Sequence, residues 1–201
     1  NLKCLETEVN DRLVTVWLNQ PEKRNALNLP LIEEIIKVFK WAEKQNELMI
    51  IVLRGRGKSF CSGADINWML DSGKAGYKKN HNDSKKLAKC FNQIYNSSKV
   101  VINLVHGDIF GGGLGFAGAA DFTFAEKNSR FRLTEVQLGL VPSVIMPYLL
   151  TRVSSRDFKY LTFSTDLFSA DEALRIGIID AVCDDIADAG NKVKELTDKI
   201  L

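Results

Sequence analysis

Short runs of β-branched and other apolar residues alternate along this chain with segments whose apolar residues recur at helical spacing. Three apolar runs bounded by turn residues are predicted strands: residues 14–18, 49–53 and 100–105. A helix is predicted from residue 29, because Asn28 is a good N-cap and Pro30 suits a first turn. This alternation of strand and helix predicts the α/β class.

The rest of the chain continues the same alternation. Further helices are predicted around residues 87–94, 114–120, 169–176 and 187–201, and further strands at 122–125 and 178–182. The sequence contains no fixed-period repeat, low-complexity tract or linker, and 201 residues is a length typical of one domain.

Composition narrows the classes of function. The 27 Lys and Arg residues nearly balance 25 Asp and Glu, so the net charge of +2 does not favour a nucleic-acid partner. The longest apolar runs, at 48–53 and 100–105, are too short to span a membrane. The four scattered cysteines form no CxxC pair, so we expect no metal site and a reducing, cytoplasmic location.

A cluster of glycines follows the predicted strand at 100–105. The run Gly111-Gly112-Gly113-Leu114-Gly115 precedes a predicted helix, which would aim free backbone N–H groups at a ligand. The spacing matches neither the dinucleotide fingerprint nor the Walker loop. The cluster alone fits close packing of helix on sheet as well as it fits ligand binding.

A second loop of small residues, 59–66, follows the strand at 49–53. One N–H group from each loop, converging on a carbonyl oxygen, would form an oxyanion hole for an enolate. Alone, this second loop is a plain turn.

Glu135 stands in the apolar segment 133–142. A carboxylate among apolar residues has a raised pKa and can exchange protons near neutral pH, although an exposed glutamate in a first helical turn also fits the pattern. Neither His81 nor His106 belongs to a catalytic arrangement, and Cys61 has no activating base nearby, so we interpret it as a core residue.

Taken together, four segments resemble the crotonase, or enoyl-CoA hydratase/isomerase, superfamily. They are residues 19–28, 60–66, 106–113 and 134–142. The resemblance implies a spiral of β-β-α units over residues 1–185. It also implies that residues 186–201 begin a C-terminal helical region, used for oligomerisation, that is largely missing from this chain.

The resemblance also assigns site residues. The N–H groups of Ala64 and Gly112 would bind the thioester oxygen, and Glu135 would be the catalytic acid/base. Residues along the path of coenzyme A or substrate would be Arg24, Ala26, Ser62, Ala64, Asp65, Ile66, Gly112 and Gly115. Hydratases of this family that use two glutamates place the first where this chain has Gly115, so the usual water-activating base is absent.

Segments 63–69, 113–116 and 133–147, with Tyr77, are similar to bacterial methylglutaconyl-CoA hydratases of leucine breakdown. The glycine and glutamate segments are similar also to dehydratases of polyketide β-branching. This likeness predicts reversible hydration of 3-methylglutaconyl-CoA to 3-hydroxy-3-methylglutaryl-CoA, with Glu135 as the sole acid/base. The distal carboxylate needs a polar partner, for which Tyr77, Asn80 and Asn82 are candidates by position.

Two other functions fit the same residues. One is a Δ3-Δ2-enoyl-CoA isomerase that uses the single glutamate. The other is a non-catalytic acyl-CoA-binding subunit, which the retained Glu135 disfavours. In each case coenzyme A is part of the ligand, no separate cofactor is implied, and the family resemblance implies a homotrimer or hexamer.

Overall fold

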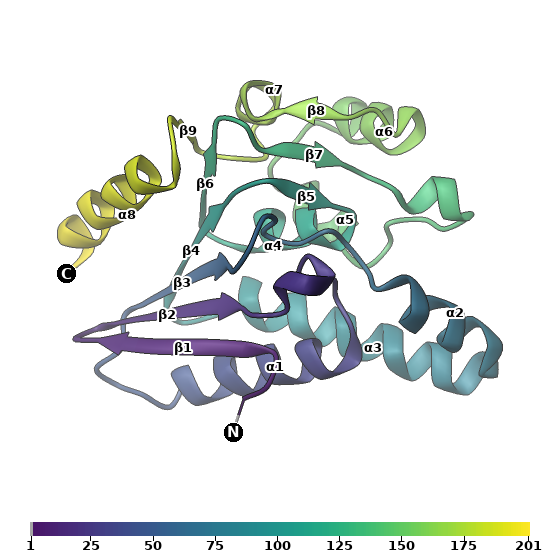
Figure 1. Cartoon of the computed structure of the whole chain (residues 1–201), viewed down its shortest axis with the longest axis horizontal. Helices are drawn as coiled ribbons and strands as arrows, with labels where there is room; N and C mark the ends of the chain where they lie inside the picture. Colours follow the sequence, from purple (N-terminus) through teal and green to yellow (C-terminus); the bar gives the residue numbers. More distant parts are fainter. Residues whose placement is uncertain (1) are drawn as a thin grey trace.

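A six-stranded sheet runs through the computed structural model, which describes residues 2–201 (Figure 1). Its strands, in spatial order, are β1 (Leu5–Asn10), β2 (Leu13–Leu18), β3 (Ile50–Gly55), β4 (Val100–Val105), β6 (Phe122–Glu126) and β9 (Ala181–Cys183). β1 and β2 pair antiparallel, and every later pair in this sheet is parallel. Parallel neighbours require long crossovers, which the helices supply.

Alternate side chains of the central strands enter two separate cores. In β3, Ile51 and Leu53 belong to the larger core, whereas Ile50 and Val52 belong to the smaller one. Both faces of the sheet are therefore covered, as the continuous apolar runs of these strands require.

Helices cover each face. The larger core includes residues of α1 (Leu29–Ala42), α3 (Gly76–Tyr95) and α4 (Gly112–Ala119), and the smaller core includes residues of α8 (Ile186–Ile200) (Figure 1). Asn28 caps α1 as predicted, because its side chain accepts a 3.0 Å hydrogen bond from the Leu31 N–H. The start of α8 coincides with the predicted boundary at residue 186, while its role in oligomerisation stays a prediction.

A second, smaller layer of strands supports the site. β5 (Asp108–Phe110), β7 (Arg130–Arg132) and β8 (Phe168–Ser169) form a sheet, and single parallel bridges join Leu27 to Ala64 and Cys61 to Ile109. A long strand, a short strand of the second layer and a helix therefore recur along the chain, as in β4, β5 and α4. The predicted α/β class and spiral of β-β-α units are confirmed.

The remaining helices have ten residues or fewer. They are η1 (Pro21–Lys23), α2 (Ile66–Lys74), η2 (Glu135–Leu138), α5 (Met146–Leu149), α6 (Ser155–Ser164) and α7 (Ala170–Arg175). No helix among residues 2–201 is both long enough and apolar enough to cross a membrane.

One predicted strand is placed wrongly. The run 178–182 was expected to be extended, but Ile178 and Ile179 close the turn after α7 and the strand starts at Ala181. The Ile178 N–H donates to the Ala173 carbonyl at 2.9 Å, and Gly177 has a φ of +87°. Both isoleucines are buried, so their apolar character reflects core packing rather than strand geometry.

Candidate active site

The loop that follows β3 is fastened by a buried asparagine. The Asn25 side chain donates to the carbonyls of Arg56 at 2.9 Å and Ser59 at 2.8 Å, and its Oδ1 accepts from the Gln20 N–H. Asn25 itself has a φ of +53°, a conformation that asparagine tolerates better than most residues. It thereby joins the turn after β2 to the start of the first predicted oxyanion loop.

Backbone pairing orients that loop. The Leu27 N–H donates to Gly63 O at 2.7 Å, and the Asp65 N–H donates to Leu27 O at 2.8 Å. Because successive N–H groups of an extended segment point to opposite sides, the Ala64 N–H points away from Leu27. It donates no hydrogen bond to any group of residues 2–201.

The second loop passes directly beside the first. A methyl group added to Gly63 would lie 3.1 Å from Phe110 O and 3.8 Å from the Gly111 Cα. Gly111 has a φ of +46° and turns the chain from β5 into α4. Gly112 then supplies the first N–H of α4, which has no acceptor among residues 2–201.

Glu135 meets these loops from η2. Its Oε2 accepts a hydrogen bond from the Thr134 N–H at 2.9 Å, and its Oε1 would lie 3.3 Å from a methyl group on Gly111. Burial raises the pKa of the Glu135 carboxyl, and the Glu135 and Thr134 backbone groups offset part of that rise. Glu135 does lie in the first turn of a helix, η2, but it is half-buried rather than exposed, and the shift of its pKa has the predicted direction.

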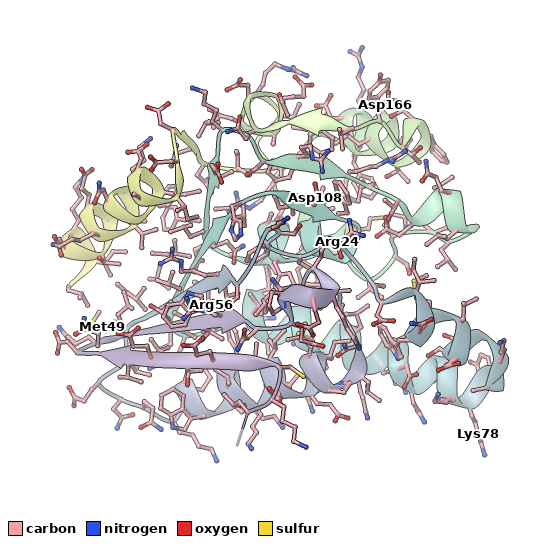
Figure 2. The ribbon with its side chains drawn as sticks, viewed as in Figure 1. Arg24, Met49, Arg56, Lys78, Asp108 and Asp166 are labelled. Atoms are coloured by element: carbon pink, nitrogen blue, oxygen red, sulfur yellow. The ribbon has the colours of Figure 1, made fainter. Side chains whose placement is uncertain are left out.

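Two hollows meet at Ala64, Gly112 and Glu135, which line both. The inner cavity, of about 320 Å³, is lined mainly by α2, α3 and residues 140–145. The outer groove, of about 470 Å³, is lined among others by Arg24, Ala26, Ser62, Asp65 and Ile66. Arg24 reaches it from the turn between η1 and α1 (Figure 2).

All the predicted site residues line these hollows except Gly115. It is buried in α4, where a methyl group would lie 2.5 Å from Ile145 Cγ2 and 2.7 Å from Phe91 Cζ. The position that holds a glutamate in two-glutamate hydratases is therefore filled by apolar atoms.

Of the three residues predicted as possible partners for a distal carboxylate, the structure places only one at the inner cavity. Asn80 lines the inner cavity, whereas Tyr77 and Asn82 do not. The Tyr77 side chain is 81% exposed and stacks on His81. The neighbouring lysines of α3 form a solvated face as predicted, and Lys78 points outward at the far end of the helix (Figure 2).

Sequence reasoning missed several residues of the site. Asn25 and Trp68 lie inside segments that carry the family resemblance but were not assigned a role, and Ser72 and Asp83 were not identified at all. The one signal available was on α3, where the polar residues Asn80, Asp83 and Ser84 recur at helical spacing. Cys61, by contrast, is a core residue as predicted, and burial raises the pKa of its thiol to about 12. No cluster of three or more His, Cys, Asp or Glu suited to a metal occurs in residues 2–201.

The β-β-α spiral, with the inner cavity and the outer groove meeting at Ala64, Gly112 and Glu135, is typical of a protein of the crotonase type. Residues 8–201 match the family described as enoyl-CoA hydratase/isomerase, and the chain belongs to that family. A crystal structure of an enoyl-CoA hydratase from Shewanella pealeana superposes with a TM-score of 0.93 at 31% identity, over 97% of this chain and 74% of that chain.

Relatives in the family include hydratases, a dehydratase and an isomerase. The dehydratase PksH of bacillaene synthase from Bacillus subtilis is 32% identical over 166 residues, which are 83% of this chain and 63% of that protein. The short-chain-enoyl-CoA hydratase of Clostridium acetobutylicum is 33% identical over 200 residues, or 96% of this chain and 74% of that protein. The match to PksH thus spans less than two thirds of its length.

Proposed function

We propose that this protein adds water to, and removes it from, an enoyl-CoA thioester, with Glu135 as the only residue that transfers protons. The observation that carries the proposal is the meeting of three groups at one cavity. The Ala64 and Gly112 N–H groups lack acceptors within residues 2–201, and the Glu135 carboxyl has a raised pKa.

The two N–H groups would bind the thioester oxygen as it becomes an enolate oxygen. Preorganised donors of this kind stabilise developing charge, and removing one typically costs about 100- to 1000-fold in rate. Both belong to backbone held by β-type pairing or by a helix start, so little reorganisation is needed when the charge forms.

Glu135 would transfer both protons in sequence. In dehydration its carboxylate takes the proton at the α-carbon and returns it to the departing hydroxyl on the same face. Burial suits this role, because a raised pKa brings the group closer to the working pH. Gly115 supports a single acid, since Phe91 and Ile145 fill the space that a second glutamate would need.

The outer groove is suited to coenzyme A. Lys23 and Arg24 line it, and exposed cations there match the charge of a nucleotide phosphate. Lys23 is 4.0 Å from Asp65, a weak surface pair that a phosphate can displace.

For the acyl group we propose 3-methylglutaconyl, hydrated to 3-hydroxy-3-methylglutaryl. Support comes from the sequence resemblance, and Asn80 is the one predicted carboxylate partner that lines the inner cavity. An isomerase that moves a double bond with Glu135 is the second candidate, supported by the same single carboxylate. The retained Glu135 disfavours a non-catalytic subunit.

We also propose a trimer or a hexamer, as the family resemblance implies. Tyr160, Phe163 and Leu167 place large apolar side chains on the surface around α6, with Phe163 73% exposed. Such a patch is typical of an interface. Analytical ultracentrifugation would contradict the proposal if it found only monomer.

The function is tested by following the conjugated enoyl-thioester absorbance with 3-methylglutaconyl-CoA and with crotonyl-CoA. We expect faster turnover of the branched substrate and a loss of about 100- to 10,000-fold in Glu135→Gln. Glu195→Gln, an exposed change on α8, is the matched control and should behave like the wild type. Preference for crotonyl-CoA would refute the acyl group, and full activity of Glu135→Gln would refute the mechanism.

A further inference from the structure

A second carboxylate lies on the wall of the inner cavity. Asp83 belongs to one face of α3 that lines the cavity with residues at helical spacing: Asn80, Asp83, Ser84 and Leu87. Asp83 is only 5% exposed, although aspartate is rarely buried without a partner.

One oxygen of this carboxylate is anchored and the other is free. The Ser72 hydroxyl donates to Asp83 Oδ2 at 2.6 Å, and the Trp68 indole N–H lies 3.4 Å from the same oxygen. Oδ1 receives no hydrogen bond from residues 2–201, yet it is not sealed inside the protein. Asp83 is therefore oriented by α2, with an unused acceptor left over.

The inner cavity contains no cation to neutralise Asp83. No Lys, Arg or His of residues 2–201 lines it, and Lys86, in the next turn of α3, pairs with Glu33 outside. A largely buried carboxylate oxygen with no hydrogen bond from the protein requires a donor from the cavity. Water, which is a reactant in the proposed hydration, is such a donor.

We propose that Asp83 positions the water that adds to the enoyl thioester. This inference rests on the proposed function, and it supplies the water contact that Gly115 cannot. One O–H of the water donates to Asp83 Oδ1, which keeps no proton. The oxygen bonds to C3 while the other proton passes to the Glu135 carboxylate, and Glu135 then protonates C2. In dehydration Asp83 accepts from the departing hydroxyl.

The test separates water addition from proton transfer. We expect a saturated thioester such as butyryl-CoA to exchange its α-proton in D2O through Glu135 and the two N–H groups of Ala64 and Gly112, with no water added to carbon. We expect Asp83→Asn to lower kcat for hydration by about 10- to 100-fold, the range of a charge-assisted hydrogen bond, and to leave exchange unchanged. Ser72→Ala, which frees the anchored oxygen, should lower hydration less and also leave exchange unchanged.

The control variant is Asp71→Asn, which removes a neighbouring exposed carboxylate from α2 and should change neither reaction. Equal losses of hydration and exchange in Asp83→Asn would mean that Asp83 only supports the structure, and would overturn the proposal. So would unchanged hydration, or a change confined to KM. Failure of Glu135→Gln to stop exchange would overturn the proposed function itself, whatever Asp83 does. A wild type that exchanges protons but adds no water would overturn both.

Discussion

Position 115 tests whether this chain has room for a second catalytic glutamate. A methyl group on Gly115 would lie 2.5 Å from Ile145 Cγ2 and 2.7 Å from Phe91 Cζ, whereas carbon atoms in contact are normally about 3.5–4.0 Å apart. Ile145 is 3% exposed and Phe91 is fully buried, so neither side chain can move into solvent. We therefore expect even Gly115→Ala to disturb the core.

The magnitude is a balance of two terms. Overpacking a filled core costs about 1–3 kcal/mol. Replacing a helical glycine by alanine returns about 1 kcal/mol. The net loss is then about 1 kcal/mol at the middle of these ranges, which corresponds to a Tm lower by about 2–4 °C for a domain of this size. Gly115→Glu should be much worse, because it also buries a carboxylate among apolar atoms.

Calorimetry and the crotonyl-CoA assay measure the outcome together. Gly190→Ala is the matched control, since a methyl group there meets nothing within 4 Å and the change should raise Tm. Replacing Phe91 by leucine in the Gly115→Ala background should give a smaller loss than the sum of the single changes. A Gly115→Glu protein with unchanged Tm and increased crotonyl-CoA hydration would refute the packing argument.

Three further predictions concern the loops and the acid. Burial raises the pKa of Glu135, so ionisation of this carboxyl lowers the stability of the folded state as the pH rises through its folded-state pKa. Glu135→Gln should therefore raise Tm near neutral pH and not in acid. A Tm difference between variant and wild type that stays the same at every pH would contradict this. Gly107→Ala should fold poorly in a soluble-expression assay, since φ is +64° and the methyl group would meet the Lys58 carbonyl oxygen; normal Tm would contradict it. Asn25→Ala should lower the free energy of unfolding by about 1–3 kcal/mol in urea, because it leaves carbonyls such as Ser59 O unpaired. An unchanged urea midpoint would contradict the role of Asn25 in fastening the loop.

The long elements could be predicted from periodicity alone. Apolar runs marked β3 and β4, and Asn28 with Pro30 marked the start of α1. β1 was not predicted, because Leu5 is its only buried residue and the strand therefore lacks the alternation of a strand with one buried face. β5, β7 and β8 have three residues or fewer, too few to show any period.

The candidate catalytic groups were also indicated by the sequence, because the family resemblance pointed to positions whose local chain geometry suits the role. The Gly112 N–H is free because it begins a helix, and Glu135 stands in the apolar segment 133–142, with a carboxyl whose pKa burial raises. What the sequence did not indicate was that Phe91 from α3 and Ile145 from the 140–145 segment meet over Gly115. That contact depends on the packing of three elements distant in sequence.

The Asp83 cluster shows why the other wall of the cavity could not be predicted. Ala75 separates α2 from α3, which begins at Gly76 with a φ of +78°, and the hydrogen bond from Ser72 to Asp83 crosses that break. In one continuous helix these residues, 11 positions apart, would be separated by about 16 Å along the axis. Their meeting therefore comes from the angle between two helices, which no pattern within either helix encodes. If Asp83 positions water, it can do so only while the angle between α2 and α3 is kept. Deleting a residue from the turn at Ala75 and Gly76 should therefore impair hydration more than proton exchange.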